Sequence, residues 1–159
     1  MDIYLLRHGI AEDGASYAED SQRPLTEEGR KKVRKAALAL RKSDLALDVV
    51  YTSPYRRAVE TAETVCETLG YSGQPVVTDA LVPGSEYRHF AKLIKDQDPT
   101  AACLFVGHMP NLSRVLAGLL RADFDTDLRK GGMAYLHVDS NGRATLGWVL
   151  TNRQLRALA

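Results

Sequence analysis

Two histidines and at least two arginines of this sequence follow apolar, strand-like segments that lie far apart in the chain. Arg7 and His8 stand in Arg-His-Gly after the first such segment, Arg57 lies in Ser-Pro-Tyr-Arg-Arg-Ala after the second, and His108 follows Gly107 after a later one. Arginine's planar guanidinium can bind phosphate oxygens through two hydrogen bonds and keeps its charge at any working pH. A neutral imidazole can attack phosphorus as a nucleophile. These residue types therefore indicate chemistry on a phosphoryl group.

The helix expected after the second segment decides which of its two arginines faces the others. Its inward stripe, at helical spacing, consists of Ala58, Ala62, Val65 and Leu69. At about 100° per residue, Arg57 lies about 100° from this stripe and Arg56 about 160° from it. We expect Arg57 to be the phosphate ligand and Arg56 to be a solvated charge.

Strands and helices alternate along the chain in an order that could bring these residues together. Short apolar runs predict strands at residues 2–6, 47–52, 75–78 and 102–106. Amphipathic patterns predict helices at residues 26–42, 54–69, 85–95 and 110–120. For the second helix we expect Ser53 as the N-cap, Pro54 at the first position and Gly70 at the end.

The last part of the chain has a different pattern. Residues 134–138 alternate between apolar and polar side chains, Asn141-Gly142 is a turn dipeptide, and residues 144–150 are again strand-like. The whole pattern predicts a single three-layer α/β domain, with helices on both faces of a mostly parallel central sheet and an antiparallel C-terminal hairpin at its edge. In such a sheet the ligand crevice lies beyond the carboxyl ends of the strands, where the histidines and arginines would converge.

Composition is that of an ordinary globular domain. The chain has 159 residues, 45% of them hydrophobic, and no repeat or linker interrupts it, so we expect one domain over residues 1–159. A chain of this length can bury roughly 70% of its unfolded surface, so it needs no disulfide or structural metal. Cys66 and Cys103 lack metal-binding or redox spacing and are expected to be buried free thiols.

Charge and hydropathy exclude two classes of partner. The 21 Lys and Arg residues nearly balance 20 Asp and Glu, and a net charge of +1 argues against nucleic-acid binding, which needs a basic excess. No signal peptide is visible, and the longest apolar stretch, residues 101–107, is far shorter than the ~20 residues of a membrane span. We therefore expect a cytoplasmic protein with no nucleic-acid or membrane partner.

Three segments, in this order, resemble the histidine phosphatase superfamily, also called phosphoglycerate mutase-like. They are Arg7-His8-Gly9, Ser53-Pro54-x-x-Arg57-Ala58-x-x-Thr61-Ala62 and Gly107-His108. The short length, together with Arg23-Pro24-Leu25-Thr26-x-x-Gly29 and Gly107-His108-Met109-Pro110, is most similar to the SixA phosphohistidine phosphatase branch.

The resemblance implies a role for each matching residue. It implies that His8 is the nucleophile and becomes transiently phosphorylated, while Arg7, Arg57 and His108 hold the phosphoryl oxygens. It implies neither a metal nor another cofactor. Arg23 lies in the segment particular to the branch, so it either faces the same pocket and binds substrate or is a surface arginine that caps the following helix.

One group that many superfamily members use on phosphate esters is missing from this chain. Those members carry a carboxylic acid, often a Glu in the stretch after the third strand, which protonates the leaving alkoxide, and this chain has Pro83 at the aligned position. Asp79 and Glu86 lie nearby and stay open as candidate acids, beside the simpler interpretation that they are solvated loop carboxylates. His89 and His137 show no metal-ligand spacing and are expected to be structural.

Without the acid, a leaving group that departs unaided is favoured. Imidazole has a conjugate acid with a pKa near ~6.5, whereas an alkoxide is a strong base. The leading hypothesis is therefore an enzyme that hydrolyses phosphohistidine on a phosphotransfer or phosphorelay protein and releases inorganic phosphate. The alternatives are a small-molecule phosphomonoesterase of the same superfamily and a non-catalytic phosphoprotein-binding module, although a module that only binds phosphate would not need the nucleophile.

Overall fold

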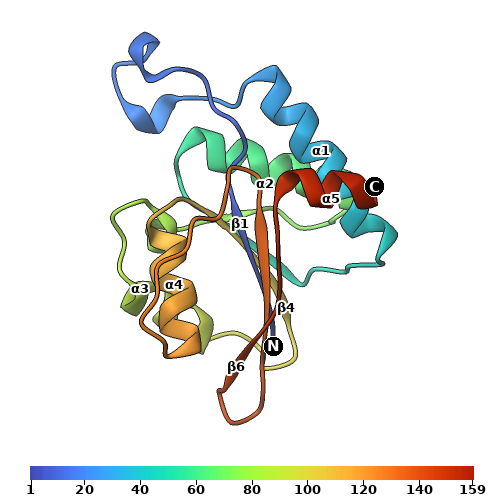
Figure 1. Ribbon diagram of the computed structural model, residues 1–159, viewed down its shortest axis with the longest axis vertical. Coiled ribbons are helices and arrows are strands. Elements are labelled where there is room, and N and C mark those ends of the chain that lie inside the picture. The colour runs from blue at the N-terminus through green and yellow to red at the C-terminus, as the bar shows by residue number, and fades with distance from the viewer.

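Six strands form one mixed sheet, and helices pack on both of its faces (Figure 1). The computed structural model describes residues 1–159. The strands are β1 (Asp2–Arg7), β2 (Val49–Thr52), β3 (Val76–Val77), β4 (Ala102–Gly107), β5 (Met133–Val138) and β6 (Ala144–Leu150). The helices are α1 (Glu27–Lys42), α2 (Arg56–Leu69), α3 (Tyr87–Lys95), α4 (Asn111–Leu120) and α5 (Asn152–Leu158). Short 3₁₀ helices are η1 (Gly14–Ser16), η2 (Asp20–Gln22) and η3 (Asp79–Leu81).

The strand order β3-β2-β4-β1-β5-β6 confirms the predicted fold class. β1, β2, β3 and β4 are parallel, and β5 and β6 form the antiparallel C-terminal edge. The register of β1 and β4 places Arg7 opposite Gly107, and that of β2 and β4 places Thr52 opposite Val106. The carboxyl ends of these three strands therefore meet at the same edge of the sheet.

Alternating residues of the central strands enter two hydrophobic clusters, one on each face. Ile3 and Leu5 pack in the cluster that contains Phe90 of α3 and the apolar side of α4. Leu6 packs in the other cluster with apolar residues of α1 and α2 and with Leu155 of α5. Burying one such side chain contributes about 1.5–3 kcal/mol, so both clusters hold β1 firmly in the middle of the sheet.

Several local predictions are confirmed. Gly70 ends α2 with φ at 72°, in the left-handed region that favours glycine. Cys66 and Cys103 are free and buried. The stripe of α2, consisting of Ala58, Ala62 and Val65, is buried as its helical spacing predicts.

α1 also packs an apolar side against the sheet, and its buried residues there are Val33, Ala36, Ala37 and Leu40. No helix of the structure has the length and hydropathy of a membrane span.

The start of α2 differs from the prediction. Its first residue is Arg56 and its N-cap is Tyr55, so the prediction of Ser53 as the N-cap and Pro54 as the first helical residue is wrong. The hydroxyl of Ser53 instead lies 2.9 Å from a ring nitrogen of His108, a partner that local sequence patterns do not reveal.

A helix that the sequence did not predict follows β6. Thr151 caps α5 and forms a reciprocal capping box with Gln154. The side-chain amide of Asn152 donates to the carbonyl oxygens of Lys32 at 3.2 Å and Gly131 at 3.4 Å. These bonds tie α5 to α1 and to the segment that precedes β5.

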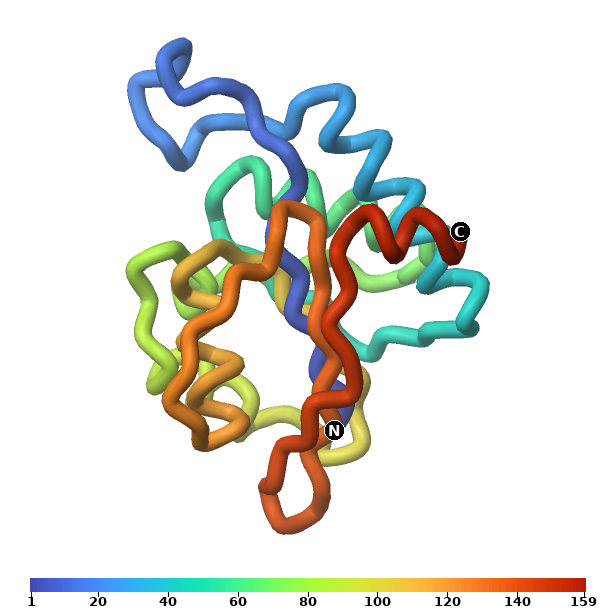
Figure 2. The backbone as a smooth tube through the Cα atoms, in the orientation of Figure 1, coloured from blue at the N-terminus to red at the C-terminus, as the bar shows by residue number.

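The segment between β1 and α1 extends beyond the carboxyl edge of the sheet (Figure 2). A bridge between Ala11 and Leu25 closes its base, and the N–H of Glu12 donates to the carbonyl of Pro24 at 2.9 Å. The segment carries η1 and η2, and Asp20 of η2 reaches the first turn of α2.

Candidate active site

Two histidine rings lie against each other where β1 and β4 end. His8 directly follows β1, and its backbone N–H donates to the carbonyl of Gly107 at 3.0 Å. His108 directly follows β4, and the two ring centroids are 4.9 Å apart. Only 6% of His8 and 2% of His108 is exposed. Parallel pairing of the two strands therefore brings two buried imidazoles together from distant parts of the chain.

Hydrogen bonding decides which nitrogen of His8 can react. Its Nδ1 lies 2.7 Å from the carbonyl oxygen of Gly9, and because a carbonyl only accepts, Nδ1 carries the hydrogen and Nε2 the lone pair. Burial, together with the positive charges of Arg57, Arg7 and Lys130, lowers the pKa of His8 to about 4. At neutral pH the imidazole is uncharged and can act as a nucleophile through Nε2.

This lowered pKa predicts a distinct pH dependence. We expect the imidazole of His8 to gain a proton only below about pH 4, where kcat/KM then falls about tenfold per pH unit. Between the unfolded value of 6.5 and about 4, the unfolded chain binds a proton that the folded chain does not, so the free energy of unfolding decreases as pH falls. Imidazole ¹⁵N NMR measures the midpoint, and titration near 6.5 would contradict a buried neutral nucleophile.

Ser53 fixes the tautomer of His108. Its Oγ lies 2.9 Å from Nε2 of His108 and accepts from the backbone N–H of Tyr55 at 3.3 Å. Ser53 is fully buried and has no other side-chain partner, so its hydroxyl donates to Nε2 and the hydrogen of His108 is on Nδ1. Burial, with the nearby charges of His8 and Arg57, lowers the pKa of His108 to about 2. His108 is therefore a neutral donor at Nδ1.

Removing the Ser53 hydroxyl is expected to disturb the tautomer of His108, although the hydroxyl itself does not contact the phosphoryl group. We expect Ser53→Ala to lower kcat about tenfold, because the loss of one buried hydrogen-bond partner costs roughly 1–3 kcal/mol and leaves the tautomer of His108 unfixed. Ser53→Thr, which keeps a hydroxyl, is expected to retain most of the activity. The ¹⁵N shifts of His108 report the tautomer directly, and an unchanged Nδ1–H tautomer in Ser53→Ala would contradict the assignment.

Arg57 lies against the reactive nitrogen of His8. Its Nε donates to Nε2 of His8 at 3.3 Å, and its terminal nitrogens donate to the carbonyl and a carboxylate oxygen of Asp20 at 2.7 and 2.8 Å. The guanidinium also lies over the ring of Tyr55, 5.0 Å from the centroid. Thr61 joins the two segments, since it donates to the Arg57 carbonyl and accepts from the backbone that follows His8. Arg57 is thus a buried cation in direct contact with the nucleophile.

The two arginines at the start of α2 provide a matched test. As the helical spacing predicts, Arg57 points into the site, whereas Arg56 is exposed and pairs with Glu60 at 2.9 Å. We expect Arg57→Ala to lower kcat/KM by roughly 10²- to 10³-fold, because it removes the positive charge that stabilises the phosphoryl group during transfer. Arg56→Ala breaks only a surface ion pair and is expected to change kcat/KM less than about twofold. Both are measured on one phosphorylated substrate with circular dichroism as a folding control, and equal losses would contradict the assignment.

Arg7 leaves a buried donor without a partner. Its Nη1 donates to the carboxylate of Asp127 at 2.9 Å and to the carbonyl of Leu128 at 2.7 Å, whereas its Nε has no partner. Nδ1 of His108 is likewise buried and unpartnered. A buried donor left unsatisfied costs roughly 1–3 kcal/mol, and an oxyanion bound beside the two histidines would recover such a cost. The arrangement therefore suits a phosphoryl group.

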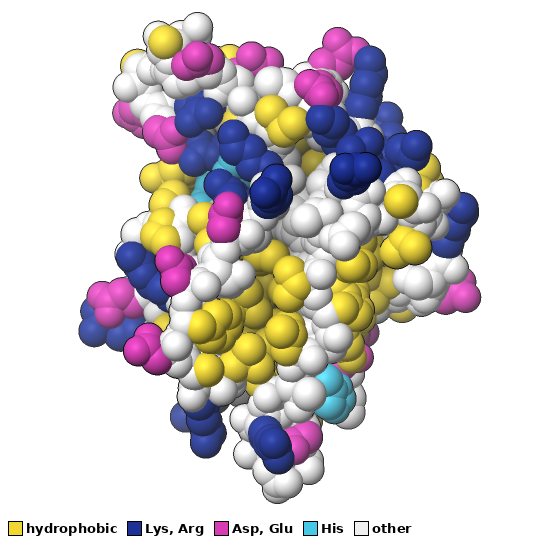
Figure 3. All heavy atoms as spheres, viewed as in Figure 1, with side chains coloured by type: hydrophobic (Ala, Val, Ile, Leu, Met, Phe, Trp, Pro, Cys, Tyr) yellow, Lys and Arg dark blue, Asp and Glu magenta, His cyan; other side chains and the backbone are white.

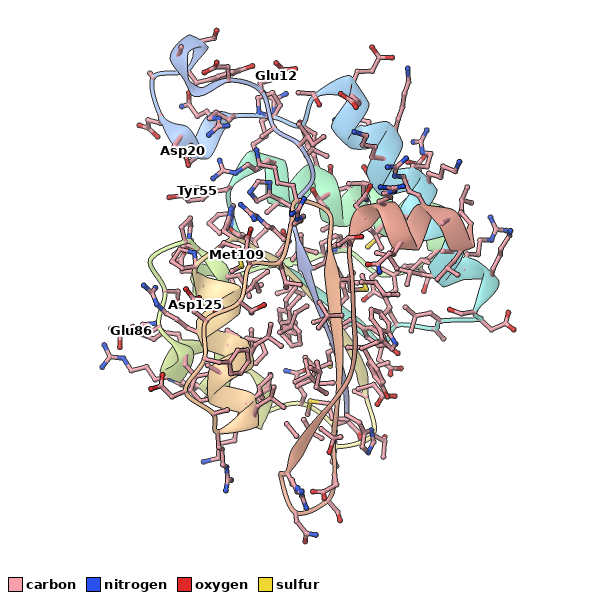
Figure 4. All side chains as sticks on the ribbon, in the orientation of Figure 1. Glu12, Asp20, Tyr55, Glu86, Met109 and Asp125 are labelled. Carbon is pink, nitrogen blue, oxygen red and sulfur yellow. The ribbon has the colours of Figure 1, made fainter.

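Asp20 is a site residue that the sequence analysis missed. Its carboxylate binds Arg57 at 2.8 Å and Arg23 at 2.7 Å, and Figure 4 shows it on the projecting segment, toward Tyr55. Arg23 is therefore joined to the site through Asp20. The alternative of Arg23 as a helix cap is wrong, because Thr26 caps α1. The spacing of an acid three residues before Arg23 is the signal that could have revealed the pair.

Neither candidate general acid contacts the two histidines. Glu86 is exposed and pairs with Arg88 at 3.0 Å, and Figure 4 shows it at the outer margin of the molecule. Asp79 is exposed in η3 and its carboxylate forms no hydrogen bond. The carboxylates that contact the predicted site are those of Asp20 and Asp127, each bound to an arginine.

The other two histidines lie outside the site. Nδ1 of His89 is 3.1 Å from the hydroxyl of Ser85, and Nδ1 of His137 is 2.7 Å from the carboxylate of Asp2. No group of three or more His, Cys, Asp and Glu side chains is placed to hold a metal ion. Both histidines thus make local contacts with their neighbours.

The first half of the chain, which carries His8 and Arg57, matches a known protein family. The family model of the histidine phosphatase superfamily, branch 1, matches residues 3–82. The chain belongs to this superfamily. As a histidine phosphatase it is a hydrolase that acts through a histidine nucleophile without a metal.

Among histidine phosphatases, the SixA branch matches the whole chain. Phosphohistidine phosphatase SixA of Escherichia coli strain K12 is 26% identical over 158 residues, which is 98% of this chain and 97% of SixA. The structure of the protein histidine phosphatase SixA complexed with tungstate covers 98% of this chain and is itself covered to 99%, with a TM-score of 0.86 and 26% identity. The expected similarity to the SixA branch is confirmed.

A second group of relatives is longer than this chain. The 2,3-bisphosphoglycerate-dependent phosphoglycerate mutase of Parvibaculum lavamentivorans is 32% identical over 96 residues, which is 59% of this chain but 46% of the mutase. The mutase thus shares only part of its length with this histidine phosphatase.

Proposed function

We propose that the protein hydrolyses phosphohistidine on a phosphotransfer or phosphorelay protein, through a covalent phosphohistidine formed on His8. The observation that carries this proposal is a neutral, buried His8 beside three donors for phosphoryl oxygens, Arg7, Arg57 and His108, with no free carboxylic acid among them. The full-length similarity to phosphohistidine phosphatase SixA supports the choice of substrate. In this proposal residues 1–159 act as one catalytic domain in the cytoplasm.

The reaction proceeds in two displacements. In the first, the Nε2 lone pair of His8 forms a bond to phosphorus while the bond from phosphorus to the substrate imidazole breaks, and the departing nitrogen takes a proton from water. In the second, water attacks the phosphorus on His8, which releases inorganic phosphate and restores the imidazole. Arg57 must turn its Nε from His8 to a phosphoryl oxygen as the first bond forms. Arg7 and His108 hold the other oxygens.

Asp20 is proposed to position the arginines and not to donate a proton. Burial raises the pKa of its carboxyl, but hydrogen bonds from Arg23 and Arg57 outweigh burial and lower the pKa below its ordinary value. Asp20 is therefore ionised at neutral pH and cannot act as a general acid. Arg23 contributes to substrate binding by holding Asp20, which in turn holds Arg57.

Release of inorganic phosphate tests the proposal. The protein is incubated in EDTA with a phosphorylated phosphotransfer protein and, in parallel, with p-nitrophenyl phosphate and small sugar phosphates. We expect the phosphohistidine protein to be the best substrate and EDTA to have no effect, because arginines and His108 meet the phosphoryl charge. Faster hydrolysis of the small esters would favour the phosphomonoesterase alternative, and binding without turnover would favour the non-catalytic module.

A further inference from the structure

A groove of about 1000 Å³ opens beside the candidate active site, between α5, the segment before β5 and α1. We call it the basic groove, because its charged lining residues are the single acid Asp127 and the cations Arg7, Lys32, Arg129, Lys130, Arg153 and Arg156. Asp127 is already paired with Arg7. Figure 3 shows Lys and Arg side chains gathered over this part of the molecule, with a histidine visible at their edge.

Three cations of the basic groove are free to bind an external anion. Arg129, Lys130 and Arg153 are exposed and form no ion pair. Lys32 pairs with Glu28, and Arg156 donates to a side chain of its own helix. Since the whole chain carries a net charge of only +1, this excess is local. A cleft lined by one sign of charge attracts ligands of the opposite sign.

Backbone hydrogen bonds hold the basic groove in a fixed position relative to the nucleophile. The N–H of Gly131 donates to the carbonyl oxygens of Arg7 and His8 at 3.1 and 3.0 Å. The side chain of Asn152 at the start of α5 donates in turn to the carbonyl of Gly131. The charge of Lys130 is close enough to contribute to the lowered pKa of His8.

We propose that the basic groove is the docking surface for an acidic face of the phosphoprotein substrate, next to its phosphohistidine. This inference rests on the proposed function and adds the chemistry of the partner, which is a row of carboxylates on one side of the phosphorylated residue. Arg7 lines both the phosphoryl site and the groove, so a ligand that fills both carries its phosphoryl group beside further negative charge. A phosphorylated protein side chain meets this requirement, and the near-neutral chain speaks against nucleic acid as the ligand.

Two phosphohistidine peptides of equal length test the charge of the partner. One is flanked by glutamates and the other by lysines, and free phosphohistidine serves as the substrate that does not reach the groove. We expect the protein to hydrolyse the glutamate peptide with a kcat/KM at least about tenfold higher than the lysine peptide, and this ratio to shrink in high salt.

Charge reversal of two exposed, unpaired groove residues locates the effect. The double variant Arg129→Glu with Arg153→Glu is expected to abolish the preference for the glutamate peptide and to change hydrolysis of free phosphohistidine less than about twofold. The matched control, Lys95→Glu with Arg143→Glu, changes net charge equally on surfaces outside the groove and is expected to keep the preference.

The outcomes separate the two proposals. If none of the phosphohistidine substrates is hydrolysed, the proposed function is overturned. If all are hydrolysed at rates independent of flanking charge, or if both double variants behave alike, the docking proposal is overturned while the function stands. Binding of a single-stranded oligonucleotide at physiological salt that only the groove variant loses, without any peptide preference, would assign the groove to nucleic acid and also overturn the docking proposal.

Discussion

Replacing His8 by alanine is expected to abolish turnover and leave the fold intact. The neutral Nε2 of His8 lies against Arg57, the carboxylate of Asp20 is held by two arginines, and the two thiols of the chain are buried in the hydrophobic clusters. In a serine protease the loss of the catalytic nucleophile lowers kcat by roughly 10⁶-fold, and we expect a loss of similar order here. Phosphate release from a phosphohistidine substrate measures the effect, and circular dichroism reports the fold.

Rapid quench with labelled substrate identifies the phosphorylated residue. We expect acid-labile, alkali-stable phosphate on His8 in the unmodified protein and none in His8→Ala. His137→Ala, which alters an exposed histidine, is the matched control and is expected to turn over normally. Label on another residue, or an active His8→Ala protein, would refute the covalent mechanism.

Hydrolysis rates are expected to follow the ability of the leaving group to depart unaided. Phosphohistidine should react fastest, aryl phosphates next, and alkyl esters such as phosphoserine slowest, because Pro83 stands where a proton donor would be and Asp20 is held ionised by two arginines. General acid catalysis contributes roughly 10²- to 10⁴-fold, so the gap between imidazole and alkoxide corresponds to about 3–5 kcal/mol. Values of kcat/KM on the three substrate classes measure it.

Variants in the nearby loop show whether an acid is truly absent. Pro83→Glu supplies a carboxyl group and is expected to narrow the gap, if the loop holds the new side chain over His8. Glu86→Gln and Asp79→Asn are expected to leave every rate unchanged, since neither carboxylate contacts the histidines. The small-molecule phosphatase alternative would be favoured if the unmodified protein hydrolysed alkyl esters as fast as phosphohistidine and if Glu86→Gln or Asp79→Asn abolished that activity.

Much of the fold could be predicted from the sequence because its elements are locally encoded. Thr26 caps α1 and Gly70 ends α2 as their residue types predict. By contrast, α5 has only seven residues and one buried side chain, Leu155, too little for a helical period to show. Its capping residues, Thr151 and Gln154, were the available signal.

Some residues of the candidate site could likewise be predicted from local patterns, and others could not. Arg57 could be placed from the helical spacing, because the spacing alone decides which side of α2 faces the sheet. Serine before proline is typical of an N-cap, so the pattern predicts Ser53 at the start of α2, whereas the hydroxyl of Ser53 contacts His108. Asp20 lies in an irregular segment, where its meeting with Arg57 depends on how that segment folds back. Contacts between distant segments were the part that local patterns could not supply.

The central place of β1 has a consequence for when the enzyme becomes active during its synthesis. Ile3 of β1 pairs with Cys103 of β4 and with Leu136 of β5. The first strand to be synthesised therefore cannot complete its pairing until two strands from the second half of the chain have been made. Pairing between such distant segments raises the contact order and slows folding. A nascent chain that ends before β4 carries Arg7 and His8 but lacks His108. One that ends just after β4 can pair β1 with β4 but lacks Gly131, whose N–H donates to the carbonyl oxygens of Arg7 and His8. Chains terminated before β4 are therefore expected to be inert toward phosphohistidine, because the two histidines of the site cannot meet until β4 has paired with β1.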